Sequence, residues 1–79
     1  MNDLIENIDR LHTTDLGKER IKKNLHIDID DVLKWCRTKI LNKNARFEKS
    51  GKNWYIIIEN FRITVNAGSY TIITAHRIR

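Results

Sequence analysis

Residues 54–78, WYIIIENFRITVNAGSYTIITAHRI, decide the fold because they hold three β-prone runs separated by short polar turns. Within the first run Trp54, Ile56 and Ile58 lie on one face, and Tyr55 and Ile57 lie on the other. Turns as short as Asn60 and Ala67–Ser69 join strands that lie antiparallel and side by side. The strands expected here are Trp54–Glu59, Phe61–Asn66 and Tyr70–Ile78.

A fourth strand is expected before this stretch. Residues Ala45–Lys49 form an edge strand in this prediction, and the turn Ser50–Asn53 joins it to the next strand. Successive short turns place the four strands in the order 1-2-3-4. The last strand carries apolar residues on both faces, Ile72 and Ile78 on one, Ile73 and Ala75 on the other. The second face is therefore expected to be partly covered by a helix or used for association.

Apolar residues at helical spacing dominate the first half of the chain. The clearest helix begins at a cap formed by Asp28 and carries a buried stripe. This stripe consists of Ile29, Val32, Leu33, Cys36 and Ile40. Leu33 and Cys36 are expected in the core together with Ile58 of the sheet.

Two further helices are expected closer to the N-terminus. They cover residues 3–11, capped by Asn2 or Asp3, and residues Asp15–Leu25, capped by Thr13 or Thr14. Inside a helix Gly17 costs about 1 kcal/mol relative to alanine, so it indicates a close backbone approach. Arg20 of the same helix is expected at the rim of the core.

These elements predict an α+β fold with two layers, in which two to three N-terminal helices pack on a four-stranded antiparallel meander. The chain has 79 residues without a linker or a repeat, so residues 1–79 are expected to form a single domain. A domain of this size has a thin core and little room for an enclosed cofactor pocket.

Composition argues against several classes of protein. Cys36 is the only cysteine, so the chain cannot form the internal disulfides that small secreted domains need. The first residues lack the basic and apolar segments of a signal peptide, and no apolar run approaches the ~20 residues of a membrane span. The expectation is a cytoplasmic protein without a membrane partner.

Positive charge is concentrated after residue 15. The whole chain carries +5, and residues 1–15 hold four acids against one arginine, a net of −3, so the remainder carries +8. This charge on a small domain is typical of a polyanion binder, although solubility alone also explains it. RNA or another polyanion is the partner expected here. The residues expected to contact nucleic acid are Lys22, Lys23, Arg62, Arg77 and Arg79.

No cofactor, metal or nucleophile motif occurs in the sequence, and its three histidines lack the spacing of metal ligands. No cofactor and no metal are therefore expected. Metal-independent RNA cleavage needs a base, an acid and cations that stabilise the phosphorane, and side chains of these types are present. The candidate catalytic residues are His12, Arg20, Tyr70, Thr74 and His76. Each of them alone also has an ordinary structural explanation, such as a loop, a surface ion pair or a strand.

Five segments carry a resemblance to a known family. They are LHTTDLG (11–17), ERI (19–21), GKNWYI (51–56), ITVN (63–66) and SYTIITAH (69–76). The chain resembles a bacterial family of short proteins catalogued as a domain of unknown function, number thirty-seven eighty-one. This resemblance covers nearly the whole chain and implies a self-contained bacterial domain, with no activity to carry over.

The layout also resembles that of the RelE and barnase-like ribonuclease toxins, in which helices precede a four-stranded antiparallel sheet. No catalytic position transfers from this fold-level resemblance. Two hypotheses stay open. The first is an RNA-binding protein that acts as a toxin-like ribonuclease, with an antitoxin as its protein partner. The second is a non-enzymatic interaction module or inhibitor from a phage or mobile element, monomeric or homodimeric.

Overall fold

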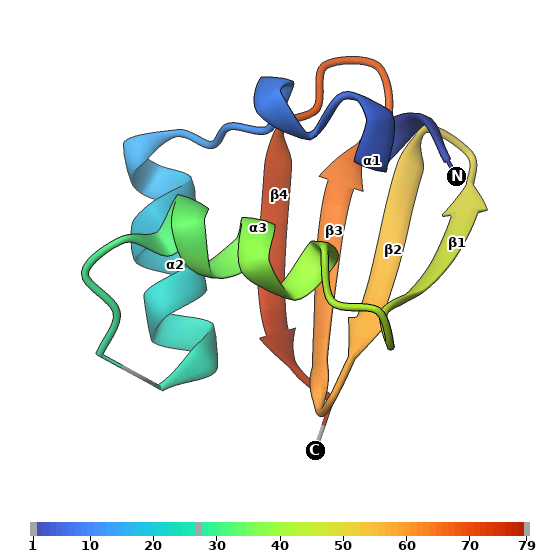
Figure 1. Cartoon of the computed structure of the whole chain (residues 1–79). Helices are drawn as coiled ribbons and strands as arrows, with labels where there is room; N and C mark the ends of the chain where they lie inside the picture. The colour runs from blue at the N-terminus through green and yellow to red at the C-terminus, as the bar shows by residue number, and fades with distance from the viewer. Residues whose placement is uncertain (1, 27, 79) are drawn as a thin grey trace.

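A computed structural model describes residues 2–26 and 28–78, and its helices pack on one face of a single sheet (Figure 1). The elements are α1 (Asp3–Glu6), the 3-10 turn η1 (Ile8–Arg10), α2 (Asp15–Leu25), α3 (Val32–Ile40), β1 (Arg46–Ser50), β2 (Asn53–Ile58), β3 (Phe61–Asn66) and β4 (Ile72–Arg77). This is the predicted α+β fold, with the strands in the predicted order β1-β2-β3-β4. In the described ranges no helix combines the length and apolar character needed to cross a membrane.

The turns between the strands explain the antiparallel order. Gly51 and Lys52 alone join β1 to β2, and Gly51 has φ +61°, which suits the first central position of a type II′ turn. Glu59 and Asn60 join β2 to β3, with Glu59 at φ 56°. Because these loops are so short, each strand pairs with the one that follows it.

The first predicted helix is too long. α1 stops before Asn7, and the 3-10 turn Ile8–Arg10 replaces the second half of the prediction. Asn2 is the cap, since its side chain accepts a hydrogen bond of 2.8 Å from an amide of the first turn. Asn7 accounts for the break: its side-chain amide donates to the Asp3 carbonyl, and asparagine side chains compete in this way with helical hydrogen bonds.

The second predicted helix is confirmed at both ends. Thr14 is its cap, with its hydroxyl oxygen 2.9 Å from the Gly17 amide nitrogen. His26 ends the helix in the left-handed conformation, at φ 56°. The close approach predicted at Gly17 is confirmed as well, because a Cβ at this position would overlap the Thr13 hydroxyl.

The third predicted helix begins later than expected. Its cap is Asp31 and not Asp28, because the Asp31 carboxylate accepts a hydrogen bond of 3.0 Å from the Lys34 amide. Only the residue directly before the first helical turn can reach the free amides of that turn. Ile29 consequently lies in the preceding loop, from which it still packs against the core.

The core lies between the helical layer and one face of the sheet. Cys36 and Ile58 are buried as predicted, with 0% and 3% of their surface exposed. Leu33 packs against the core but is only half-buried, so the prediction that it is buried is wrong. α3 directs Val32, Cys36 and Ile40 at the sheet, and Leu33 is rotated ~100° from Val32 around the helix axis.

β4 differs from the predicted last strand. It is shorter at both ends, and Ile72 and Ala75 both face the core, whereas simple alternation predicts opposite faces. The cause is a β-bulge, since the register of β4 shifts where it pairs with Thr64 and Val65 of β3. The extra residue is Ile73, which is 37% exposed.

Burial makes the Cys36 thiol unreactive. It raises the pKa of this thiol to about 12, so almost no thiolate forms at neutral pH. We expect dithionitrobenzoate to leave the native protein unlabelled and to react at once in denaturing guanidinium chloride. Rapid labelling of the native protein would contradict the position of α3. Because the unfolded thiol ionises first, this shift also makes folding stability fall as the pH rises from 9.0 toward 12.

Candidate functional site

None of the described helices covers the second face of the sheet (Figure 1). Side chains on this side form two neighbouring rows across the four strands. The first row consists of Arg46, Ile57, Arg62 and His76, and the second of Glu48, Tyr55, Thr64 and Thr74. We call these two rows the open face.

The centre of the open face combines a cation with an aromatic ring. Arg62 is exposed and pairs with the half-buried His76 of the adjacent strand. Arg62, Tyr55 and Ile57 line a hollow of about 370 Å³, which Glu48 and Ser50 complete. This volume lies in the lower part of the range of small-ligand sites and is sufficient for a planar ring.

α2 extends the open face beyond the edge strand β4. Asn24 donates a hydrogen bond of 3.1 Å to the hydroxyl of Thr74. The side of α2 that carries Asn24 therefore borders the open face. Arg20 precedes Asn24 by one helical turn on the same side, and Lys23 follows Arg20 by three residues. Both cations are exposed, so α2 adds positive charge alongside β4.

His12 is held beside the beginning of β4. Its backbone forms a parallel bridge with Thr71, which precedes the core-facing Ile72 and so points to the open side. His12 Nδ1 is 2.8 Å from the Arg10 carbonyl oxygen, and Nε2 is 3.0 Å from the Thr71 hydroxyl oxygen. Because a carbonyl oxygen only accepts, Nδ1 carries the proton in the neutral imidazole. The basic nitrogen Nε2 is then directed at a hydroxyl group.

The turn that leads into β4 supports this arrangement. The hydroxyl oxygens of Ser69 and Thr71 are 2.7 Å apart. The side-chain oxygen of Asn66 accepts hydrogen bonds of 2.9 Å from the amides of Gly68 and Ser69. Such an asparagine turn holds the loop in one shape. A chain of hydroxyl groups therefore ends at His12 Nε2.

Tyr70 lies in the core and not on the open face. Only 8% of its surface is exposed, and its φ of 58° is uncommon for a residue other than glycine. The Arg10 guanidinium lies 4.7 Å from the centre of the Tyr70 ring. Arg10 is absent from the sequence-based candidates, because only the folded turn at Tyr70 brings the two side chains together. No spacing in the sequence signals this contact.

The five candidate catalytic residues do not form one cluster. Tyr70 is buried, whereas the other four follow the border between β4 and α2. We call this line of His12, Arg20, Thr74 and His76 the β4 seam. Thr71, which holds His12, is five residues from His76, and because one of the residues between them is the bulge residue Ile73, the distance along the strand is about 13 Å. An acid and a base that act on one phosphate have to lie much closer, so His12 and His76 of one chain cannot serve the same phosphate.

Three of the predicted nucleic-acid contacts, Arg62, Lys22 and Lys23, do not share one surface. Arg62 belongs to the open face, and Lys23 lies next to the β4 seam. Lys22 lies on another side of α2, at a hollow that Asp15 and Glu19 also line. Neighbouring carboxylates weaken the attraction of Lys22 for a polyanion.

The remaining two predicted contacts are at the C-terminal end of the chain. Arg77 Nε donates a hydrogen bond of 2.7 Å to the Leu25 carbonyl, and its guanidinium lies 5.7 Å from the centre of the Phe61 ring. The hydrogen bond of Arg77 therefore holds β4 against the C-terminal end of α2. Arg79 lies outside the described residues.

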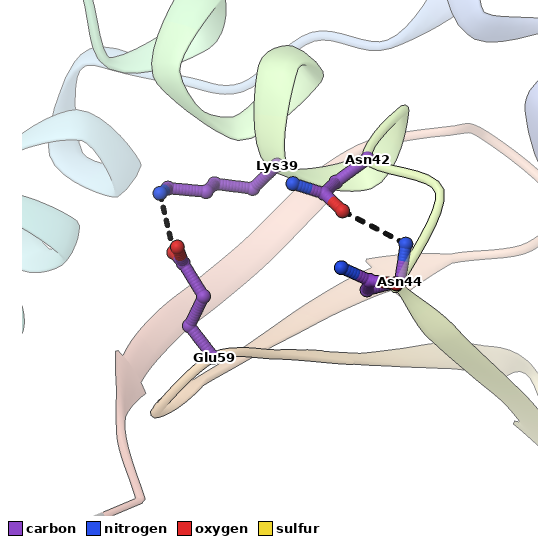
Figure 2. A network of polar contacts seen from close by, with 4 residues as sticks. All are labelled: Lys39, Asn42, Asn44 and Glu59. Atoms are coloured by element: carbon purple, nitrogen blue, oxygen red, sulfur yellow. Dashed lines mark hydrogen bonds and ion pairs between the residues drawn. The ribbon is translucent and has the colours of Figure 1, made fainter.

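The helical side of the molecule uses its charges for packing. Figure 2 shows the ion pair between Lys39 of α3 and Glu59 of the turn between β2 and β3. Lys39 Nζ also lies 5.5 Å from the centre of the Trp35 ring. In the loop before β1, the Asn42 side chain accepts a hydrogen bond from the Asn44 amide. These contacts fix the loops around α3.

Comparison with known proteins identifies the family of this chain. The family model described as "Protein of unknown function (DUF3781)" matches residues 5–76. The chain belongs to this family. The matched region of the DUF3781 family includes the whole β4 seam and both rows of the open face. No curated protein and no solved structure matches the chain significantly.

The DUF3781 description names no activity, so the function has to be inferred from the open face and the β4 seam. Within residues 2–26 and 28–78, no group of three His, Cys, Asp or Glu side chains is placed to hold a metal ion.

Proposed function

We propose that the protein binds single-stranded RNA on the open face and along the β4 seam. The observation that carries this proposal is the adjacency of Arg62 and His76 on an uncovered sheet, beside the ring of Tyr55. α2 borders the same surface with Arg20 and Lys23. Basic side chains that follow a strand of nucleic acid, together with an aromatic ring for its bases, are typical of single-strand binding.

The arginine side chains are suited to the phosphate groups. A guanidinium donates two parallel hydrogen bonds to a phosphate, and both Arg20 and Arg62 are exposed. The β4 seam is about 13 Å long, which corresponds to about four stacked nucleotides at ~3.4 Å each. Glu48 lines the hollow beside Tyr55, but it lies in β1, three strand spacings or about 14 Å from β4, so the path along the β4 seam is clear of its charge.

Cleavage of the bound RNA is a second candidate function, favoured by the geometry of His12. In this step a 2′-hydroxyl of the RNA takes the place of the Thr71 hydroxyl beside His12 Nε2. His12 Nε2 then accepts the proton of this 2′-hydroxyl. The 2′-oxygen forms a bond to phosphorus, the bond to the 5′-oxygen breaks, and that oxygen leaves with a proton from water. Arg20 on the same seam stabilises the negative charge of the phosphorane. The products are a 2′,3′-cyclic phosphate and a 5′-hydroxyl end.

RNA binding is tested by fluorescence anisotropy with a labelled single-stranded RNA at low salt. We expect a complex at micromolar protein, and about tenfold weaker affinity for Arg62→Ala and for Arg20→Ala. Each lost phosphate contact should also lower the slope of log affinity against log salt by about 0.7. Tyr55→Ala should weaken binding by about 1–3 kcal/mol without changing this slope.

Lys34→Ala is the matched control, because Lys34 is an exposed cation of α3 on the helical side. If it weakens binding as much as Arg62→Ala does, net charge and not the open face attracts the RNA. If no complex forms at micromolar protein, the interaction-module hypothesis replaces RNA binding. Cleavage is tested separately: His12→Ala should bind RNA but form no cyclic phosphate, and RNA left intact by the wild type rules out cleavage alone.

A further inference from the structure

The two edges of the sheet differ in how their backbone groups are used. At the β4 edge, the Ile72 amide donates to the His12 carbonyl at 2.7 Å, and the Ile72 carbonyl accepts from the Thr13 hydroxyl at 3.0 Å. At the β1 edge, no strand of the described chain pairs with the outer side (Figure 1). An open edge of this kind is a template for another strand.

The turn after β1 determines which backbone groups face outward. A two-residue turn makes Ser50 a residue that is hydrogen-bonded to β2. Bonded positions alternate along an antiparallel pair, so Glu48 and Arg46 also bond to β2. Phe47 and Lys49 therefore direct their amide and carbonyl groups away from the sheet.

We propose that β1 pairs antiparallel with β1 of a second copy of this chain, with Phe47 opposite the partner's Phe47. In this register the two phenylalanines exchange both of their backbone hydrogen bonds. Each Lys49 amide donates to the partner's Ala45 carbonyl. The Ala45 amide itself is bonded to the Asn42 carbonyl at 3.0 Å, so the ladder ends there.

Charge selects this register over its neighbours. It places Arg46 opposite the partner's Glu48, and the two-fold axis repeats the pair on the other side. These positions are not hydrogen-bonded, so their side chains are closest, and opposite charges stabilise such pairs. A shift by two residues sets Glu48 against the partner's Glu48 in one direction and Arg46 against the partner's Arg46 in the other. Both shifted registers bring like charges together.

The other side of the junction is apolar. Phe47 is half-buried, with its ring centre 6.2 Å from that of Trp54 at an interplanar angle of 87°. The partner's Phe47 covers part of this ring that the single chain exposes. Lys49 lies 5.7 Å from the centre of the Trp54 ring, and such charges on an edge strand discourage pairing with unrelated strands. Because the contact is short, we expect a dissociation constant on the order of 10–100 µM.

The dimer has one continuous sheet in which the two open faces lie side by side. Within it Arg46 of one copy neutralises Glu48 of the other, which is the acid of the open face. The pairing uses only the β1 edge, so a test of the dimer does not depend on whether the protein binds RNA.

Sedimentation equilibrium of the RNA-free protein, from about 10 µM to 1 mM, tests the dimer. We expect the wild type to dimerise, and Arg46→Glu and Glu48→Arg to dissociate at least about tenfold more readily, because each sets like charges opposite one another. The double variant Arg46→Glu/Glu48→Arg should recover the wild-type affinity. An equimolar mixture of the two single variants should form a heterodimer, since its cross-strand pairs are again of opposite charge.

A wild type that stays monomeric at 1 mM overturns the proposal. So does Arg46→Glu that dimerises like the wild type, or a double variant that stays monomeric, since another surface or register would then be in use. Circular dichroism checks that the exposed substitutions leave the fold intact. Lys49→Pro provides a second variant: the only backbone hydrogen-bonding group that it removes is an amide that faces outward, so it should abolish the dimer and keep the β1–β2 pairing.

Discussion

Ile63→Ala is expected to lower the free energy of unfolding by about 2–5 kcal/mol. Ile63 lies in the interior strand β3, and none of its surface is exposed. Its removal leaves a cavity beside Ile56 and Ala75, with which it pairs. A domain of this size has a total stability of only about 4–12 kcal/mol, so this one substitution should remove a large fraction of it and lower the melting temperature by about 10 °C or more.

Ile73→Ala is the matched control for this variant. It removes the same atoms from the adjacent strand, but Ile73 occupies the bulge and is 37% exposed. We expect a loss of about 1 kcal/mol or less. Urea unfolding followed by the fluorescence of Trp35 and Trp54 measures both variants. Equal losses would show that the faces of β4 are assigned wrongly.

Gly17→Ala should destabilise the protein by about 1–3 kcal/mol, although alanine is the better helix former. A Cβ at position 17 would overlap the Thr13 hydroxyl and lie 3.2 Å from that of Thr14. The Thr13 hydroxyl donates to the Ile72 carbonyl, and the Thr14 hydroxyl caps α2. Disturbing both contacts outweighs the gain of about 1 kcal/mol in helix propensity.

A double-mutant cycle with Thr13→Ala identifies the cause of this loss. Thr13→Ala alone should destabilise the protein, because the Ile72 carbonyl loses its partner. In that background Gly17→Ala no longer displaces the Thr13 hydroxyl, and only the looser approach to the Thr14 hydroxyl remains, so its cost should shrink or change sign. Thermal melting of the four proteins gives the coupling energy. If Gly17→Ala costs the same stability in both backgrounds, the contact between positions 13 and 17 does not explain why position 17 is a glycine.

The candidate site was only partly predictable. Chemical type identifies His12, Arg20 and His76 as candidates, and the structure places all three along the β4 seam. Chemical type alone could not distinguish Tyr70 from these residues, because burial depends on the rest of the fold and tyrosine is common both in cores and in functional sites. It also missed Tyr55, whose ring lines the hollow beside Arg62. Alternation in β2 places Tyr55 opposite the apolar face, so this signal was present in the sequence.

The sequence by itself determined the elements and their pairing. The bounds of α2, the bounds of β3 and the strand order follow from caps, turns and periodicity, which act between residues a few positions apart. Only the tertiary structure decided which side chains meet. The contact of His12 with Thr71 spans 59 positions, and that of Asn24 with Thr74 spans 50. Such contacts depend on the packing of α2 against β4 and on the bulge at Ile73, and no local pattern encodes either.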